Sequence, residues 1–542
     1  MVVASIAATT LLAACNGERP SRGGTPEAAG TAATRGERSS PESPAASPAP
    51  PPAVRRLACA HRLPGVETGP EPAASEAVVA VRKKEWEAGF GGEIAARPHV
   101  RARVTALPSR ALIGAAELPS ADESFLRRIA HDTWRGLAGW TDRENGLPLD
   151  IVRFPHAPDS LDDPLVGDYT SATDIGLYLA SVCAAADLHL IERDEAVARA
   201  SAVLETIKKL ESAHGFFFNF YDTTSLERTS NFLSFVDSAW LVTGLVLVRA
   251  TFAELATAAT ELIEQQDFGF LYDRDAGLFH HGYWIQRSSP SIFHYGIFYS
   301  EARLAYLVAI GTGDVPAEAW HRMQRIVPPL CDRAGPEPTA VVVSPASDDR
   351  AALGYYEWKG FRYLPSWGGS MFEALMPTLV VDEEELSPNG LGPSDEAHAR
   401  VQRHYALHDL GYPVWGISSS TTPDGAVYAE YGVPVLGARG YGDQAVSPHA
   451  SALALAVTPK EAVDNLRRLA QRYDVYGEYG FYDSVDPRSG RVAYAYLALD
   501  QAMTFLAVAN HLGGGIVTRR FASDPVFERM APLLRAEGTP VQ

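Results

Sequence analysis

Residues 355–373 read Tyr-Tyr-Glu-Trp-Lys-Gly-Phe-Arg-Tyr-Leu-Pro-Ser-Trp-Gly-Gly-Ser-Met-Phe-Glu. The stretch combines aromatic rings, glycines that allow a close backbone approach, and a carboxylate at Glu373. Aromatic rings cover the apolar faces of a sugar, while fixed polar groups hold its hydroxyls. This mixture favours a saccharide-binding cleft. The alternative is a buried aromatic corner between two helices.

On both sides of this stretch, apolar residues recur at helical spacing. The predicted helices are 124–140, 173–188, 194–211, 236–255, 299–312, 320–327, 371–381, 395–410, 448–456, 460–473 and 499–512. Strand patterns are few: one substantial strand at 340–344 and weaker ones near 216–221 and 425–431. The sequence therefore predicts a mainly α fold, with a doubly wound α/β fold as the weaker alternative.

A short turn motif recurs between the predicted helices. Asp142, Asp273 and Asp486 are each followed four residues later by Gly146, Gly277 and Gly490 respectively. Glycine readily takes the positive φ that a tight turn of this kind requires. Such turns at one rim of alternating helices fit a toroid of six inner and six outer helices.

Composition excludes some classes of partner. The chain has 542 residues, 46% hydrophobic content and a net charge of −19. Nucleic acids and anionic membrane surfaces both attract clustered Lys and Arg, so neither is an expected partner. A neutral polysaccharide is compatible with this acidic balance.

The first residues have the pattern of a lipoprotein signal peptide over 1–15. An apolar segment leads into Leu12-Ala13-Ala14-Cys15, which matches a bacterial lipobox, so Cys15 is the expected lipidation site. The segment is too short to span a bilayer. Asn16 favours the periplasmic face of the outer membrane, with membrane contact only through the lipid. The alternative is a chance Ala-rich stretch, since no Lys or Arg precedes it.

The remaining chain divides by composition into four parts. Residues 16–75 are rich in Pro, Ala and Ser and are predicted to be a disordered tether. The others are an N-terminal extension (76–122), a catalytic domain (123–515) and a C-terminal tail (516–542). Cys59, Cys183 and Cys331 lack metal-ligand spacing. Cys183 is predicted to be buried, and a disulfide among the three stays open.

Carboxylates beside aromatic residues at helix ends are the candidate chemical groups: Asp174, Asp222, Asp237, Glu301, Asp443, Asp483 and Asp500. Asp174 and Asp237 could equally serve as helix caps. Glu301 opens an apolar helix, where it is either a partner of the helix dipole or an acid with a raised pKa. A sugar hydrolase needs two carboxylates, one on each side of the scissile bond. Trp240, Trp367 and Trp415 could stack on sugars or pack in the core.

Five motifs, in order along the chain, resemble the glycoamylase-like domain: Ser300–Leu304, Gly311–Pro316, Trp367–Pro377, Val414–Ser418 and Gly480–Asp483. That domain occurs in bacterial endo-β-1,2-glucanases of glycoside hydrolase family 144. More distantly, it is the middle domain of cyclic β-1,2-glucan synthases. The resemblance covers roughly residues 125–515.

The resemblance implies an (α/α)6 barrel with short β-hairpins at the cleft end, acting on β-1,2-glucosidic bonds without metal or organic cofactor. By motif, Glu301 is the expected general acid. Asp237, Asp483 and Asp500 are acidic positions of the same cleft, one of which activates water. Residues expected to bind substrate are Asp174, Asp222, Trp240, Arg303, Trp367, Glu373, Trp415, Asp443 and Tyr482. An ion pair is also expected for Arg303.

One residue departs from the related pattern. The synthase domains continue Trp-Gly-Ile-Ser with Glu, whereas this chain has Ser419. The missing carboxylate favours a hydrolase, most simply an inverting one, over a transglycosylase.

Three hypotheses follow. The first is a monomeric, lipid-anchored periplasmic endo-β-1,2-glucanase. The others are a catalytically silent glucan-binding lipoprotein and a hydrolase of another glucosidic linkage.

Overall fold

The computed structural model describes residues 54–56, 103–327, 338–341 and 353–538. The predicted signal peptide with Cys15, almost all of the tether, Cys59 and Cys331 lie outside these residues. Within the tether, Val54–Arg56 forms strand β1, which pairs with β13 (Pro338–Val341). The prediction of disorder is therefore wrong for these three residues. The strand predicted at 340–344 exists as far as Val341, beyond which the chain is outside the described residues.

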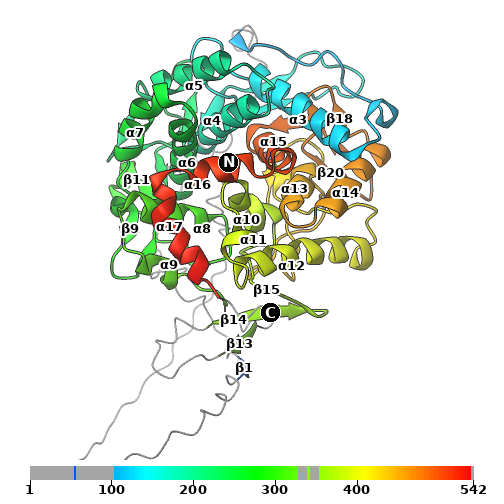
Figure 1. The fold of residues 1–542 in the computed structure, drawn as a ribbon. Coiled ribbons are helices and arrows are strands. Elements are labelled where there is room, and N and C mark those ends of the chain that lie inside the picture. The colour runs from blue at the N-terminus through cyan, green and yellow to red at the C-terminus, as the bar shows by residue number, and fades with distance from the viewer. Residues whose placement is uncertain (1–53, 57–102, 328–337, 342–352, 539–542) are drawn as a thin grey trace, which may run out of the picture. The chain divides into compact units, whose positions relative to one another are not determined.

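The described chain is mainly helical, as predicted (Figure 1). The α-helices are α3 (Asp122–Gly139), α4 (Ala172–Asp187), α5 (Arg193–Ile207), α6 (Phe235–Thr251), α7 (Ala256–Glu264), α8 (Ala302–Thr312), α9 (Glu318–Arg322), α10 (Met371–Leu375), α11 (Glu383–Leu386), α12 (Leu391–His404), α13 (Pro448–Leu453), α14 (Pro459–Arg472), α15 (Ala498–Gly513), α16 (Ile516–Ala522) and α17 (Pro525–Ala536). Helices α10 and α13 continue into the 3-10 turns η6 (Met376–Leu379) and η8 (Ala454–Ala456).

Several predicted boundaries are wrong. The helices predicted over 194–211 and 320–327 end at Ile207 and Arg322. The helix predicted over 236–255 ends at Thr251, and a separate helix, α7, follows it. The predicted tail, 516–542, contains α16 and α17, which pack against α6 and α8. These two helices cover apolar surface of the body and are part of it.

Six helices, here called the inner helices, form a continuous series of neighbours. Helix α4 contacts α6, α6 contacts α8, α10 contacts α13, α13 contacts α15, and α15 contacts α4. Arg303 of α8 joins α10 by donating to the carbonyl oxygens of Glu373 (3.3 Å) and Ala374 (2.5 Å). Each inner helix also has a second partner: α5 on α4, α7 on α6, α17 on α8, α12 on α10, α14 on α13 and α3 on α15.

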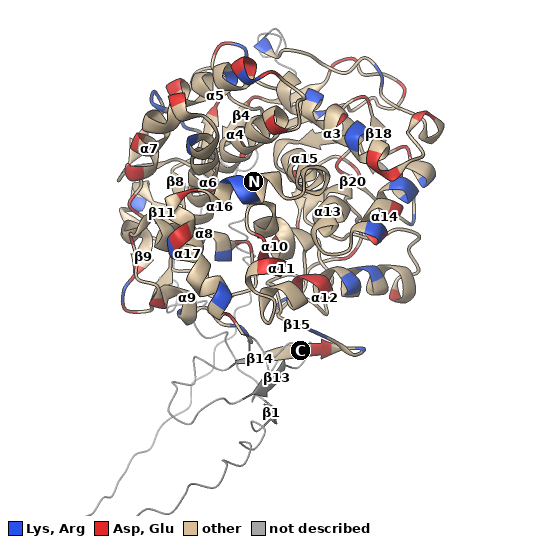
Figure 2. Ribbon diagram, in the orientation of Figure 1, with Lys and Arg blue, Asp and Glu red and all other residues tan. Residues whose placement is uncertain are grey.

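The inner helices are apolar after their first turn. Figure 2 shows charged residues along α5, α12 and α14, whereas α15 is uncharged over most of its length. Burial on all sides explains this composition, since an unpaired interior charge is costly. Cys183 of α4 is buried, as predicted. Among the described helices, none combines the length and the apolar character that crossing a membrane requires.

Glycines allow α4 and α6 to pack closely. A Cβ added to Gly176 would lie 2.2 Å from the carbonyl oxygen of Trp240, and one added to Gly244 would lie 2.2 Å from that of Gly176. Any larger side chain would force the two helices apart. Their first turns are therefore close enough for Thr173 Oγ1 to donate to Asp237 Oδ1 at 2.6 Å.

The sheets are small and antiparallel. The longest, β1-β13-β14-β15, includes β14 (Leu353–Trp358) and β15 (Phe361–Tyr363). The three-stranded sheets are β12-β11-β8 (Ser289–Pro290, Gly282–Trp284, Phe232–Ser234) and β22-β2-β3 (Ala495–Leu497, Ile151–Arg153, Leu165–Gly167). The pairs are β4-β7 (Tyr169–Ser171, Phe220–Asp222), β5-β6 (Ser212–Ala213, Phe216–Phe217), β9-β10 (Tyr272–Asp273, Leu278–Phe279), β16-β17 (Ser420–Thr421, Tyr428–Ala429), β18-β19 (Tyr476–Gly477, Gly480–Phe481) and β20-β21 (Ser484–Val485, Val492–Ala493).

Several strands lead directly into inner helices. β4, β8 and β22 end at the residue before α4, α6 and α15 respectively. Each strand therefore fixes the direction in which the following helix begins. The short strands lie at the N-terminal ends of these helices.

The opening stretch of the sequence analysis begins as a hairpin and not as a corner between two helices. Lys359 and Gly360 both have positive φ, +49° and +85°, as a two-residue hairpin turn requires. Tyr363 is buried, and its hydroxyl donates to the Val435 carbonyl oxygen. The hairpin precedes α10, whose first turn carries Glu373.

The recurring Asp-to-Gly motif forms tight turns, as predicted. Gly146, Gly277 and Gly490 have φ between +70° and +75°. A fourth turn was missed because its last residue is Leu226, at φ +63°. Its N–H donates to the Asp222 carbonyl oxygen at 3.0 Å.

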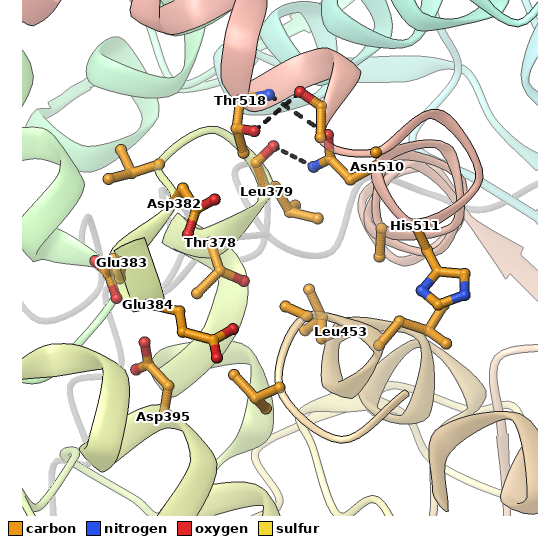
Figure 3. Close-up of a pocket in the computed structure, with 17 residues that line it drawn as sticks. Thr378, Leu379, Asp382, Glu383, Glu384, Asp395, Leu453, Asn510, His511 and Thr518 are labelled. Carbon is orange, nitrogen blue, oxygen red and sulfur yellow. Dashed lines mark hydrogen bonds between the residues drawn. The ribbon is translucent and has the colours of Figure 1, made fainter. Parts of the chain in front are cut away.

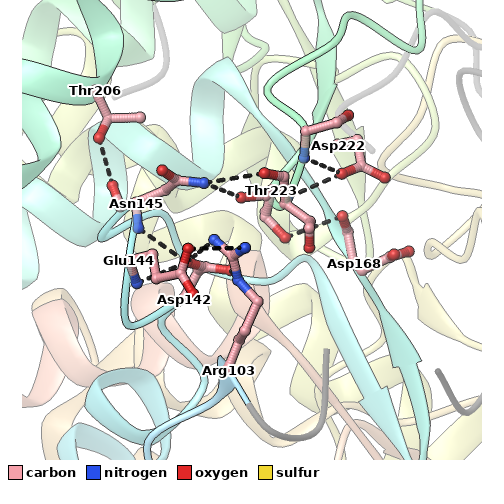
Figure 4. A network of polar contacts seen from close by, with 10 residues as sticks. Arg103, Asp142, Glu144, Asn145, Asp168, Thr206, Asp222 and Thr223 are labelled. Carbon is pink, nitrogen blue, oxygen red and sulfur yellow. Dashed lines mark hydrogen bonds and ion pairs between the residues drawn. The ribbon is translucent and has the colours of Figure 1, made fainter. Parts of the chain in front are cut away.

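Polar contacts link the N-terminal extension to the first turn, and the first turn to the fourth (Figure 4). Arg103 donates to both carboxylate oxygens of Asp142, at 2.8 and 2.9 Å. Asn145 donates to the Thr223 carbonyl oxygen at 2.8 Å. The described part of the extension is thus anchored on the turns.

Arg303 forms the buried ion pair that the sequence predicted. Its guanidinium donates to both oxygens of Glu383, at 2.8 and 2.7 Å, and lies 3.7 Å from Asp395. Tyr299 donates to Asp395 at 2.6 Å. These side chains are almost inaccessible to solvent, so each charge depends on its partner.

Arg303→Met should lower the free energy of unfolding by about 3–5 kcal/mol, because it leaves Glu383 charged and buried without its partner. Urea denaturation followed by circular dichroism measures this loss. Arg193→Met, at the exposed pair with Glu254, is the matched control and should have a much smaller effect. Equal losses in the two variants would contradict a structural role for Arg303.

Candidate active site

Five of the six inner helices carry a carboxylate at the start of their first turn. These residues are Asp174 on α4, Asp237 on α6, Glu301 immediately before α8, Glu373 on α10 and Asp500 on α15. The sixth helix, α13, carries His449 in the same turn. The fold therefore gathers residues from distant parts of the chain.

Asp174 and Asp237 are tied to neighbouring hydroxyl and amide groups. Asp174 accepts from the Ser171 N–H at 3.0 Å, and Ser171 Oγ accepts from the Asp174 N–H at 2.9 Å. This reciprocal capping confirms the alternative that the sequence left open. Asp237 accepts from the hydroxyls of Thr173 and Ser234, one at each oxygen. Burial, and more weakly Asp174, raises the pKa of Asp237.

Glu301 and Glu373 form a second acidic pair. Burial and the Glu373 carboxylate raise the pKa of Glu301 from 4.5 to about 8, and Asp237 adds to this effect. Glu373 accepts from the Gly368 N–H at 2.8 Å, and its pKa is raised by burial. The charges of Glu373 and Asp237 therefore both act on Glu301.

Asp483 and Asp500 form a third pair. Burial and Asp500 hold the pKa of Asp483 well above its usual range. The pKa of Asp500 is raised to about 7 by burial, while its hydrogen bond with Asp483 opposes the increase. Asp500 Oδ2 lies 3.0 Å from His449 Nδ1, and burial lowers the His449 pKa to about 4. Asp483 Oδ2 also accepts from the Thr421 N–H at 2.6 Å.

Asp150 belongs with these acids, although the sequence analysis did not select it. Burial and Asp174 raise its pKa from 3.8 to about 7, and Asp150 in turn raises the pKa of Asp500. It lies just before β2, outside any helix start, so no periodicity marks it. The seven residues Asp150, Asp174, Asp237, Glu301, Glu373, Asp483 and Asp500 are called the carboxylate cluster below.

Two opposing effects act on the carboxylate cluster. The N-terminal end of a helix favours a negative charge, whereas burial favours the neutral acid. The side chains of the cluster are only 1–4% exposed. Burial dominates at Glu301 and Asp500, whose pKa values are both raised. Glu301 and Asp500 can therefore hold protons near neutral pH, as proton transfer to or from a substrate requires.

Four residues predicted to bind substrate lie in the core. Trp240, Trp415 and Tyr482 are almost completely buried, and the Tyr482 hydroxyl donates to the Ala111 carbonyl oxygen at 2.8 Å. Arg303 is held by Glu383 and by backbone carbonyls, as described above. The contacts of these four side chains in this structure are core packing and ion pairing, and their predicted binding roles stay predictions.

Three other predicted residues keep some exposure. The Asp222 carboxylate accepts from the N–H groups of Thr224 and Ser225, so it stabilises a turn instead of joining the carboxylate cluster. Asp443 accepts from the Tyr405 hydroxyl at 2.9 Å. Trp367 is half-buried, and the Arg439 guanidinium lies over its ring, 5.1 Å from the centroid.

Glycine at position 368 brings a tyrosine to the cluster. A Cβ there would lie 2.0 Å from carbon atoms of the Tyr441 ring, so the ring can lie against the backbone only because no side chain intervenes. The carboxylates of Glu373, Glu430 and Glu301 help to raise the Tyr441 pKa, after burial. The close backbone approach expected from the Gly-Gly pair is confirmed.

A pocket of about 280 Å³ lies elsewhere (Figure 3). It is lined by Thr378 and Leu379 after α10, Leu455–Val457 after α13, and Asn510 and His511 near the end of α15. These residues follow or end the inner helices, whereas the carboxylate cluster lies where the helices begin. The pocket lining includes no member of the cluster.

Asp150→Asn should test the electrostatics of the cluster. The folded protein holds the Asp150 proton more tightly than the unfolded chain, so this stabilisation is full below about pH 4 and is lost as the pH rises through about 7. Asn cannot ionise. The free energy of unfolding of Asp150→Asn, relative to that of the wild-type protein, should therefore increase by about 2–3 kcal/mol from pH 5 to pH 8.

Urea denaturation at both pH values measures this difference. Asp486→Asn, in a turn outside the carboxylate cluster, is the control and should show no gain that grows with pH. A pH-independent effect of Asp150→Asn would show that Asp150 has no raised pKa.

Comparison with known proteins identifies related sequences. Residues 350–525 match the glycoamylase family model, described as "Putative glucoamylase". Over 303 residues, the chain is 33% identical to the cyclic β-(1,2)-glucan synthase NdvB of Rhizobium meliloti (strain 1021). That match covers 53% of this chain but only 9% of the synthase.

Solved structures show the same fold at low identity. The endo-β-1,2-glucanase from Chitinophaga pinensis, in complex with sophorotriose and glucose, has a TM-score of 0.60 at 16% identity; the match covers 77% of this chain and 98% of that one. The β-1,2-glucanase from Parabacteroides distasonis has a TM-score of 0.61 at 15% identity, covering 77% and 60%. The resemblance of this chain to the glycoamylase-like domain is thereby confirmed, and its mainly helical fold is that of these glucanases.

Proposed function

We propose that this chain is an endo-acting glycoside hydrolase that cleaves β-1,2-glucan by general acid/base catalysis with inversion. The observation that carries the proposal is the carboxylate cluster, in which acids at the starts of four inner helices, α6, α8, α10 and α15, have raised pKa values. The inner helices and their second partners support an (α/α)6 barrel as the architecture. The names of the similar structures support the substrate and the internal mode of cleavage.

Glu301 is the proposed general acid. With a pKa of about 8, its carboxyl group is mostly protonated at neutral pH. It can then donate a proton to the glycosidic oxygen as the bond breaks, and the developing negative charge on the leaving group is neutralised. The neighbouring Glu373 keeps this proton in place, since two adjacent carboxylates resist double ionisation.

The pair Asp483–Asp500 is the proposed base. The two carboxyl groups interact directly, and their hydrogen bond raises the pKa of Asp483 but lowers that of Asp500, which favours Asp500 as the group that ionises first. An ionised Asp500 can accept a proton from water, directly or through a substrate hydroxyl. Asp237 has both oxygens occupied by hydroxyl donors, so we assign it to positioning.

Ser419 supports hydrolysis over glucosyl transfer. It is nearly buried, and its N–H donates to Ser370 Oγ at 3.2 Å, beside the first turn of α10. A serine at this position cannot form the carboxylate-bound glucosyl intermediate of a double displacement. Direct attack by water, with inversion, requires no such nucleophile.

A substrate panel separates this proposal from its two alternatives. The purified protein is incubated with linear β-1,2-glucan, laminarin, cellulose and starch, and the products are separated by chromatography. Release of short β-1,2-linked oligosaccharides supports the proposal. Binding without products would favour a silent glucan-binding protein, and cleavage of another polymer would favour a different linkage.

Glu301→Gln should lower kcat on β-1,2-glucan at least about 100-fold, because glutamine cannot donate the proton. In the wild-type protein, kcat/KM should fall as the pH rises through about 8, where Glu301 loses its proton. Initial rates from pH 5 to pH 10 measure both effects.

Asp222→Asn is the matched control, since an amide oxygen can still accept from the turn N–H groups. Its rate should stay near that of the wild-type protein. A Glu301→Gln variant with a similar rate and an unchanged pH profile would remove Glu301 from the acid role.

We also propose that the protein is a monomer anchored by lipid at Cys15 to the periplasmic face of the outer membrane. The lipobox supports this location. When the full-length chain is expressed in a Gram-negative host with a labelled fatty acid, the wild-type protein should carry the label and sediment with membranes. Cys15→Ser should abolish both. Persistent labelling of Cys15→Ser would place the lipid elsewhere.

A further inference from the structure

Asp273, His280 and His294 bring three metal-binding side chains together outside the carboxylate cluster. One donor atom from each lies within 4.8 Å of the others. Asp273 Oδ2 is 3.0 Å from His294 Nε2 and 3.9 Å from His280 Nε2. The two imidazole rings are stacked, with centroids 4.4 Å apart.

The backbone fixes this arrangement. His280 and His294 face each other in an antiparallel bridge, and the His280 N–H donates to the Leu271 carbonyl oxygen at 3.1 Å. Asp273 lies on β9, whose pairing with β10 leads directly to His280. Its other oxygen, Oδ1, accepts from the N–H groups of Asp275 and Ala276 in the turn. The turn thus holds the carboxylate with Oδ2 toward the histidines.

A hydrogen bond explains only part of the geometry. Asp273 and His294 are within hydrogen-bond distance, but His280 Nε2 is too far from Oδ2 for such a bond. Ligands bonded to zinc at 2.0–2.2 Å are separated from one another by roughly 3–4 Å. The three donor atoms therefore need only small side-chain movements to share one ion.

We propose that Asp273, His280 and His294 bind a divalent transition-metal ion of the zinc class. Two imidazoles and one carboxylate suit Zn²⁺ and Co²⁺, and they leave a coordination position for water. The site has a route to solvent, since the Asp273 and His280 side chains are 23% and 16% exposed while His294 is buried. The proposal is independent of the proposed hydrolase activity.

A bound ion would stabilise the chain segment that precedes and contacts the start of α6. His281 follows the ligand His280, and its carbonyl oxygen accepts the N–H of Phe235, the first residue of α6, at 3.0 Å. Beyond His281 the chain enters β11, which pairs with β8 just before α6. Metal binding would therefore stabilise the segment that places Asp237, without contacting the carboxylate cluster itself.

The test titrates Zn²⁺ and Co²⁺ into full-length, untagged protein from which metal has been removed with EDTA. We expect one equivalent of either ion to bind, visible absorption from bound Co²⁺, and a higher Tm with Zn²⁺. His280→Ala keeps the Asp273–His294 hydrogen bond, and Asp273→Asn keeps an acceptor for the turn. Each should weaken binding at least tenfold and reduce the Tm increase.

His156→Ala, at an exposed histidine outside the group, is the matched control and should bind as the wild-type protein does. Binding that is unaffected by both His280→Ala and Asp273→Asn would overturn the proposal, as would failure of the wild-type protein to bind either ion below millimolar concentration. Because the readouts are metal affinity and Tm, these results do not depend on whether the protein cleaves glucan.

Discussion

The main constraint on this structure is that several carboxylates lie together at the buried N-terminal ends of its inner helices. A helix start favours negative charge, but the loss of water around a carboxylate opposes ionisation more strongly at this site. The balance appears in the raised pKa values of Glu301 and Asp500. Protons are therefore held at neutral pH by groups that would be fully ionised in water. This property links the packing of the helices to the chemistry that they can perform.

The rest of each inner helix is adapted to this arrangement. After the first turn the helices are almost uncharged, and Gly176 and Gly244 bring α4 and α6 into close contact. Arg303 is the main exception, and it is paired with Glu383 and bonded to backbone carbonyls of α10. One buried positive charge thus connects α8 to α10. The acidic groups at the helix starts have no comparable cation directly bonded to them among the contacts described above.

Short hairpins and tight turns help to position the N-terminal turns of the inner helices. Strands β4, β8 and β22 end at the residue before the inner helices α4, α6 and α15 respectively. The turns at Asp142, Asp222, Asp273 and Asp486 repeat one geometry, in which the aspartate carboxylate accepts from N–H groups inside the turn. At Asp273 the same geometry leaves one carboxylate oxygen directed toward two histidines. A turn that is structural elsewhere therefore supplies the proposed metal ligand.

The sequence by itself determined the helical class and most helix positions, and it selected Glu301, Asp237, Asp483 and Asp500 as candidate acids. Apolar periodicity and first-turn acids are local patterns, so they survive without knowledge of the fold. Only the tertiary structure separated these acids from Asp222, which stabilises a turn, and from Trp240, Trp415 and Tyr482, which lie in the core. It also added Asp150, His449 and the group around Asp273. Their roles arise from contacts between residues far apart in the chain, and no spacing in the sequence records such contacts.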